Sequence, residues 1–321
     1  YMFTQVETRL TVEHIHRRWH PQIMHDVHQM GRQGARLFVP PYTDPWEPNV
    51  DPALRAAANA IGMHVAARLT SDGRRGIVTN ATFDAWTPAR AYHHYHCGIR
   101  ILTEAASARV ATPIEIEFED LSENVKTPSV RMPLVWKGGK WSLRDIMDYN
   151  YSAAKAALTN AARLRENWLR NFYRIHKKAV TRSQAHFAFI VPVDQQDLST
   201  AVKMLNVLKM GAVEIHRASR SFDVEGHTYP AGSFIVYLAQ PYGGFAKTLL
   251  ERQVYPEIRE TPGGPLKTPY DVVGHTLPLL MGVQVVRADK PFQVEKVLLD
   301  EIIQPKGIFE PVESAYGYAW G

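Results

Sequence analysis

The stretch Ile23-Met-His-Asp-Val-His-Gln-Met-Gly31 decides how the first half of this chain is interpreted. Its side chains alternate, so His25 would face one side of a strand while Asp26 and His28 face the other. The pattern predicts a short strand that ends near Gly31. Because ligands of open α/β sheets gather beyond the carboxyl ends of strands, His28 is a candidate functional residue as well as a candidate structural histidine.

A second stretch, Gly98-Ile-Arg-Ile-Leu-Thr-Glu104, also alternates and then passes into the small residues 105–108. It predicts another strand, with Glu104 at its end. A carboxylate in that position can serve as a general base, or it can form a salt bridge at the rim of the sheet. An imidazole and a carboxylate at two strand ends are two of the groups that metal-assisted hydrolysis needs.

The two stretches carry a family resemblance. Residues 19 to 110 resemble the C-terminal half of the catalytic domain of the zinc carboxypeptidase family, in HPQIMHDVHQMGRQGARLFVPPYTDPWEPNVDP (20–52), ATFDAW (81–86) and GIRILTEAAS (98–107). The resemblance implies that His28 is the third ligand of a Zn²⁺ ion. It implies equally that Glu104 is the general base that activates zinc-bound water in the hydrolysis of a peptide or protein substrate.

Two features of that family are not found in this sequence. The family's first two zinc ligands are a His and a Glu three residues later, and none of the 14 histidines has Glu at that spacing. Since a catalytic zinc site needs about three protein ligands, we expect the other two upstream of this chain. The family's mobile Tyr has Phe83 as its nearest counterpart, with Tyr92 and Tyr95 as later options, and we assign its role to none of them.

The segment Tyr92-His-His-Tyr-His-Cys97 is a rival candidate metal site, because it gathers three imidazoles and the only thiol. Alternation would place His94 and His96 on one side and His93 and Cys97 on the other. We therefore favour packing, or a wall of the active site, over metal binding.

Composition limits the classes of function. With 321 residues and 45% hydrophobic content, the chain has material for about two domains. A net charge of +5 without a basic stripe argues against nucleic acid binding, and no apolar run approaches the roughly 18 residues that a membrane helix needs. The single Cys leaves the compartment undecided, although the resemblance favours a secreted or periplasmic protein. The oligomeric state is open.

Local patterns outline the remainder of the first part. The proline-rich residues 40–52 predict an irregular loop, which we expect to line the cleft near His28. Residues 51–70 predict a helix with Asp51 as N-cap and Asp72-Gly73 as its end. Residues 109–150 predict strands and loops, and a long helix is predicted from about Tyr151.

The pattern changes after residue 180. An apolar strand over 185–192, a helix over 198–210 and a strand over 212–216 predict a parallel sheet. With YPAGSFIVYLAQPY (229–242) and TPYDVVGHTLPLLMGV (268–283), this part resembles a glutamine-amidotransferase-like module. Because Cys97 lies outside it, the module has no thiol nucleophile. The polar residues around Asp271 and His275 are read as turn and capping groups.

These observations predict an α/β protein with a partial carboxypeptidase-like mixed sheet, flanking helices and a smaller parallel-sheet α/β domain. The expected domains are residues 1–180, 181–290 and a C-terminal linker or further segment at 291–321. The predicted function is zinc-dependent metallocarboxypeptidase-like proteolysis, incomplete in this fragment. The alternative is a non-catalytic binding or scaffold protein with the same fold, and a third hypothesis is another amidohydrolase chemistry such as cell-wall peptide trimming.

Overall fold

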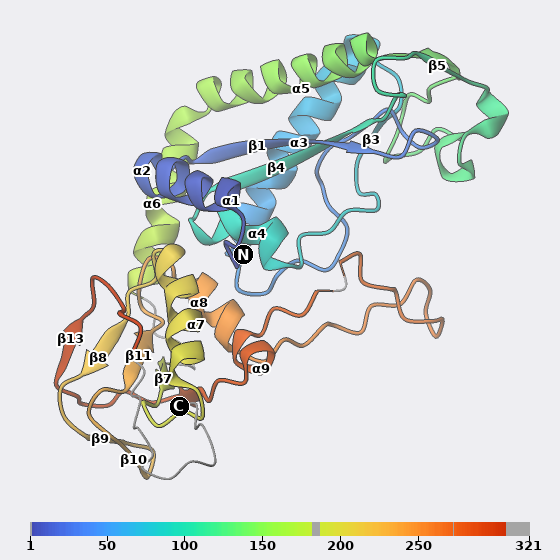
Figure 1. Ribbon diagram of the computed structural model, residues 1–321. Helices are drawn as coiled ribbons and strands as arrows, with labels where there is room; N and C mark the ends of the chain where they lie inside the picture. The colour runs from blue at the N-terminus through green and yellow to red at the C-terminus, as the bar shows by residue number, and fades with distance from the viewer. Residues whose placement is uncertain (1, 182–186, 272, 306–321) are drawn as a thin grey trace, which may run out of the picture.

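Two parallel strands of eight residues each lie at the centre of the first part of the molecule (Figure 1). They are β1 (Ile23–Met30) and β4 (Ile99–Ala106), paired without interruption over their whole length. The computed structural model describes residues 2–181, 187–271 and 273–305. Both predicted strands are confirmed, although the second continues two residues past Glu104.

The first sheet is mixed and has four strands, in the order β1-β4-β2-β3. The short strand β2 (Leu37–Phe38) runs antiparallel to β4, and β3 (Ile77–Val78) runs parallel to β2. Helices α3 (Pro52–Ser71) and α5 (Leu143–Arg163) pack on each other and on β4. The predicted mixed sheet with flanking helices is therefore confirmed.

Helix α3 begins and ends where its sequence predicts. The Asp51 side chain accepts a hydrogen bond from the backbone N–H of Ala53 at 2.9 Å, and Pro52 occupies the first turn, where a missing N–H costs nothing. Gly73 follows the helix with a φ of +76°, a left-handed conformation that glycine adopts readily. The helix buries the apolar stripe that includes Leu54, Ile61 and Leu69.

The histidine-rich segment is helical, which corrects the strand-like alternation assumed for residues 92–97. Helix α4 (Pro88–Tyr95) follows Thr87, with its proline in the first turn, and His96 and Cys97 end it. Successive residues of a helix are rotated by about 100°, so the two predicted faces do not exist. All three histidines of the segment are buried, as packing requires.

The long helix predicted from Tyr151 begins eight residues earlier. Ser142 and Asp145 form a capping box. The Ser142 hydroxyl accepts a hydrogen bond from the Asp145 backbone N–H, and the Asp145 carboxylate accepts one from the Ser142 backbone N–H. A second helix, α6 (Arg165–Val180), continues from α5 toward the second part of the molecule (Figure 1).

The second sheet is antiparallel, which corrects the predicted parallel sheet. Its order is β12-β7-β11-β8-β13, and every neighbouring pair is antiparallel. Strands β7 (Ala188–Val191) and β8 (His216–Ala218) do run in the same direction around helix α7 (Leu198–Met210), as a strand-helix-strand unit requires. They are not neighbours, however, because β11 (Phe234–Tyr237) inserts between them.

The C-terminal segment predicted as a linker contributes to this sheet. Strand β13 (Lys296–Leu298) pairs with β8, while residues 306–321 lie outside the described part, as do residues 185 and 186 of the predicted first strand. The other elements are α1 (Val6–Thr11), η1 (Val12–His16), α2 (Arg17–Trp19), β5 (Ile114–Ile116), η2 (Phe118–Asp120), η3 (Glu123–Val125), β6 (Gly139–Trp141), β9 (Phe222–Val224), β10 (His227–Tyr229), α8 (Gly243–Leu250), α9 (Leu277–Met281) and β12 (Val286–Ala288).

One hydrophobic core joins the two parts. Its buried residues run from Phe3 through α3 and β4 to α7 and α8, and Phe245 on α8 packs against Tyr95 with ring centroids 5.6 Å apart. A buried polar network crosses the same junction. Asn49 Nδ2 donates to Glu47 Oε1 at 3.1 Å and to Glu251 Oε1 at 2.6 Å.

Glu47 makes this junction sensitive to pH. Its side chain is 2% exposed, and burial raises its pKa to about 7, with hydrogen bonds from Asn49, Thr248 and Tyr95 opposing the rise. A carboxyl group whose folded pKa is raised stabilises the fold below its unfolded pKa of about 4.5, and this stability is lost as pH rises through 7. The loss amounts to about 3 kcal/mol, from 1.36 kcal/mol per pKa unit.

We therefore expect Glu47→Gln to be more stable than the wild type at pH 8 and to differ little from it at pH 5. The free energy of unfolding in urea at the two pH values measures this. The exposed Glu115→Gln is the matched control and should follow the wild type. An identical pH dependence in Glu47→Gln and the wild type would contradict the assignment.

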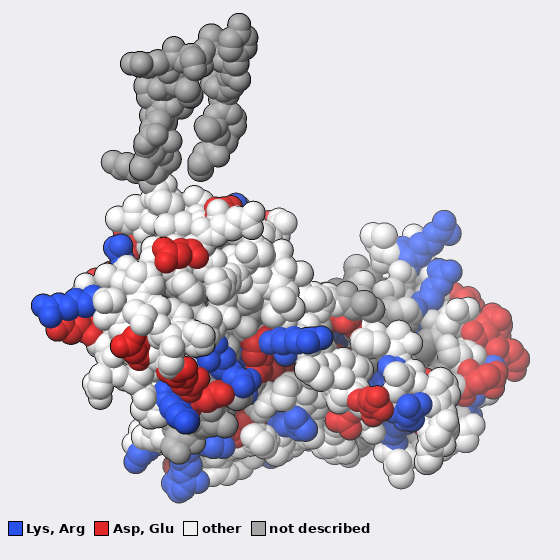
Figure 2. All heavy atoms as spheres, turned by 90° about the horizontal axis from the view of Figure 1, so that it is seen from below, with Lys and Arg blue, Asp and Glu red and all other residues white. Residues whose placement is uncertain are grey.

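The surface carries charges of both signs. On the face shown in Figure 2, basic and acidic side chains lie interspersed over both parts of the molecule. In the described ranges, no helix has the length and apolar character to cross a bilayer.

Candidate functional site

The strand register brings His28 and Glu104 together. They are direct partners in the parallel pair β1-β4, so their side chains leave the sheet on the same face. His25 lies on the opposite face, where its Nε2 is 2.9 Å from Thr103 Oγ1. The two residues identified in the sequence are thus neighbours, and His25 is separated from them as alternation predicts.

His28 is oriented by a carboxylate on its own strand. Its Nε2 lies 2.8 Å from Asp26 Oδ1, and Asp26 Oδ2 accepts from Arg100 Nε at 3.1 Å and from Nη2 at 2.5 Å. Burial opposes ionisation of Asp26, but the charge and hydrogen bonds of Arg100, together with the hydrogen bond from His28, hold its pKa below the usual value. An ionised Asp26 favours the His28 tautomer that carries its proton on Nε2, which leaves the Nδ1 lone pair available.

Glu104 has the environment of a basic carboxylate. The side chain is only 7% exposed, and among the described residues none donates a hydrogen bond to it. Burial raises its pKa, while the nearby His28 ring and the positive charges of Arg90 and Arg100 limit the rise. A carboxylate that holds a proton more strongly than an exposed Glu is a better proton acceptor for general base catalysis.

Both residues line a cavity of about 860 Å³. Its apolar wall includes Phe38, Val78 and Phe83, and its polar lining includes Arg90 and Arg131. A cavity of this size suits a short peptide or another small molecule. The proline-rich loop does not line it, which corrects our expectation for residues 40–52.

A complete metal site is not formed by the described residues. No three His, Cys, Asp or Glu side chains among them gather closely enough to hold a metal ion. His28, with its Asp26 partner, has the arrangement of a zinc-binding histidine and its supporting carboxylate. His28 nevertheless supplies only one ligand, whereas a catalytic zinc site has about three protein ligands.

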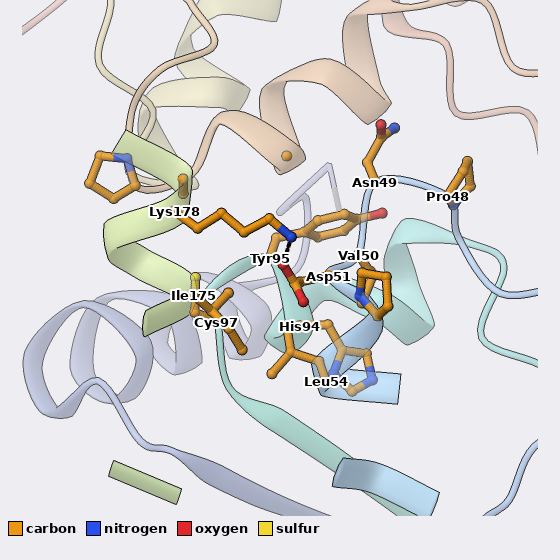
Figure 3. A pocket seen from close by; sticks show the side chains of 14 residues that line it. Pro48, Asn49, Val50, Asp51, Leu54, His94, Tyr95, Cys97, Ile175 and Lys178 are labelled. Carbon is orange, nitrogen blue, oxygen red and sulfur yellow. Dashed lines mark hydrogen bonds and ion pairs between the residues drawn. The ribbon is translucent and has the colours of Figure 1, made fainter. Parts of the chain in front are cut away.

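A second cavity, of about 260 Å³, lies where the proline-rich loop meets α6 (Figure 3). Lys178 reaches across it to Asp51, with Nζ 2.8 Å from Oδ2. Asp51 also caps α3, so this ion pair ties α6 to the start of α3. Cys97 lines the same cavity, but burial raises the pKa of its thiol to about 12, which leaves it protonated and unreactive at neutral pH.

The histidines of α4 belong to a buried aromatic cluster. His16 lies between His93 and His96, with ring centroids 5.1 and 5.0 Å away, and the His96 ring lies 4.4 Å from that of Tyr242. Burial lowers the pKa of His16 to about 4 and that of His96 to about 3. These imidazoles are therefore neutral at physiological pH and fill the core, which agrees with packing rather than chemistry.

Sequence reasoning missed three residues that line the main cavity: Arg90, Tyr270 and Asp271. Arg90 lies two residues before the histidine-rich segment 92–97 and was given no role, and Asp271 was assigned to turn chemistry. Nothing in the local sequence indicates that residues so far apart in the chain share a site. No protein-family model matches the chain, and neither a curated protein nor a solved structure matches it.

Proposed function

We propose that this chain is part of a zinc-dependent, metallocarboxypeptidase-like peptide hydrolase, with Glu104 as general base and His28 as one zinc ligand. The observation that carries the proposal is the β1-β4 register, which places a carboxylate of raised pKa beside a histidine held by Asp26 at the edge of a large cavity. The resemblance of residues 19 to 110 to the zinc carboxypeptidase family supports the same roles.

The chemistry required of this chain is proton transfer. Glu104 takes a proton from the attacking water and then delivers it to the leaving amine, as a single carboxylate can do in peptide hydrolysis. Asp26 and Arg100 hold the His28 ring in place. Zinc, when bound, would polarise the scissile carbonyl, and the proposal requires two further ligands from sequence outside the described residues.

The test is zinc stoichiometry and release of C-terminal residues from peptides by a protein that includes any residues preceding Tyr1. We expect about one zinc per chain, and we expect His28→Ala to lower zinc affinity by more than the roughly 10- to 100-fold that loss of an outer-shell partner costs, because it removes a ligand itself. His25→Ala is the matched control, since His25 lies on the opposite face of β1. Unchanged zinc affinity in His28→Ala, or no zinc in the wild type, would favour the non-catalytic binding protein.

A further inference from the structure

The connection between α8 and α9 leaves the second part of the molecule and runs back along the first (Figure 1). We call its residues 251–271 the strap. Two of them, Tyr270 and Asp271, line the cavity that contains Glu104 and His28, although they follow Glu104 by more than 160 positions in the chain. The cavity of the first part is therefore completed by a segment of the second.

The end of the strap is held by an ion pair. Arg90 Nε on α4 lies 2.5 Å from Asp271 Oδ2, and the two side chains are only 15% and 30% exposed. The Arg90 guanidinium also stacks on Tyr270, with Cζ 4.1 Å from the ring centroid, and the Tyr270 ring contacts Phe83 at 5.2 Å. Arg90 thus fixes both residues beside the cavity.

Two more contacts attach the strap along its length. Lys267 Nζ donates to Thr43 Oγ1 at 3.2 Å and to the Asp44 carbonyl at 2.8 Å. Tyr255 packs edge-on against Trp86, with ring centroids 5.2 Å apart. The strap is thus attached to the first part of the molecule at three places. Its end, with Tyr270 and Asp271, forms a fixed wall of the cavity.

We propose that the strap supplies the specificity-determining wall of the substrate cavity. Tyr270 contacts the substrate and, with Phe83, selects an aromatic or large apolar side chain, while Asp271 and Arg90 are positioning residues that hold Tyr270. The proposal rests on the proposed function insofar as the substrate is a peptide. Tyr270 is 43% exposed, so part of its ring is free to meet a ligand.

The positioning role is tested without any measurement of activity. Asp271→Asn removes the charge partner of Arg90, and we expect trypsin to cut after Lys267 at least tenfold faster than in the wild type, because the strap detaches more often. Asp72→Asn is the matched control, since Asp72 forms an exposed ion pair with Arg68. Equal rates of cleavage in Asp271→Asn and the wild type would overturn the positioning role.

The specificity role is tested by binding and by turnover of N-blocked tripeptides that end in Phe or in Gly. We expect Tyr270→Ala to raise Kd and KM for the Phe peptide about three- to tenfold, the loss expected for one aromatic contact, with kcat unchanged and the Gly peptide little affected. Tyr270→Phe should restore most of the binding, and Tyr173→Ala, at an exposed position on α6, is the control.

The outcomes separate this proposal from the proposed function. If the wild type binds the Phe peptide in calorimetry but does not hydrolyse it, the hydrolase proposal fails while the strap remains supported. If Glu104→Gln abolishes hydrolysis but Tyr270→Ala changes neither peptide's Kd, the specificity role is overturned and the hydrolase stands. Absence of any binding of the Phe peptide by the wild type overturns the specificity role as well.

Discussion

Glu104→Gln is expected to lower kcat for peptide hydrolysis by about 10²- to 10⁴-fold, the usual contribution of a general base. The amide occupies the same volume as the carboxylate but cannot accept the proton of the attacking water. Because Glu104 is proposed as the base and not as a zinc ligand, the zinc content of the variant should equal that of the wild type. Release of C-terminal residues from peptides and metal analysis measure the two quantities.

Two controls sharpen this experiment. Glu47→Gln changes a buried carboxyl group at the junction of the two parts, away from the cavity, and should keep its turnover at pH 7. Glu115→Gln changes an exposed one. Turnover within tenfold of the wild type in Glu104→Gln would refute the proposed role of Glu104, whereas loss of zinc from this variant would make Glu104 a ligand instead.

The sequence predicted the centre of the candidate site because its signals are local. Alternation in residues 23–31 and 98–104 predicts two strands, and both exist. Their direct pairing, which makes His28 and Glu104 neighbours, depends on register across a gap of about 70 residues and has no local signature. Asp26 as the partner of His28 follows from alternation, since residues two apart share a face of a strand.

The errors also have physical causes. Residues 92–97 are too short and too uniform in polarity for periodicity to distinguish a helix from a strand, and the proline in the first turn of α4 was the signal that we missed. The strand-helix-strand pattern predicted the common direction of β7 and β8, although β8 begins at His216, where the predicted strand 212–216 ends. It could not reveal that β11 would insert between them, because that pairing depends on a strand further along the chain. The position of the strap could not be predicted either, because it depends on contacts with residues far away in the chain.

Acid is expected to unfold this protein below about pH 5, because four buried histidines must take up protons. Burial lowers the pKa of His16 and His94 to about 4 and that of His96 to about 3, and it holds the pKa of His93 well below its usual value. Their mutual proximity, with His20, His176, Arg17 and Arg100 nearby, opposes protonation further.

Proton linkage gives the direction and size of this loss of folding stability. A histidine with a lowered folded pKa stabilises the fold above its unfolded pKa of 6.5, and this contribution is lost as pH falls from 6.5 through about 4. At pH 4.5 each of His16, His94 and His96 costs about 2 to 3 kcal/mol, or about 8 kcal/mol together, and His93 changes stability in the same direction. Protonation of Glu47 stabilises the fold by about 3 kcal/mol over the same fall in pH. The net loss of stability is still comparable to the whole stability of a typical domain.

The variant that isolates this effect is His96→Phe. Neither ring nitrogen of His96 has a hydrogen-bond partner among the described residues, so an aromatic ring of similar shape loses no bond and cannot be protonated. We expect its midpoint of acid unfolding, followed by circular dichroism, to lie at lower pH than that of the wild type, with about 2 to 3 kcal/mol more stability at pH 4.5. His14→Phe, at an exposed position, should leave the midpoint of acid unfolding unchanged. If His14→Phe shifted the midpoint as much as His96→Phe, the buried cluster would not determine the pH of acid unfolding.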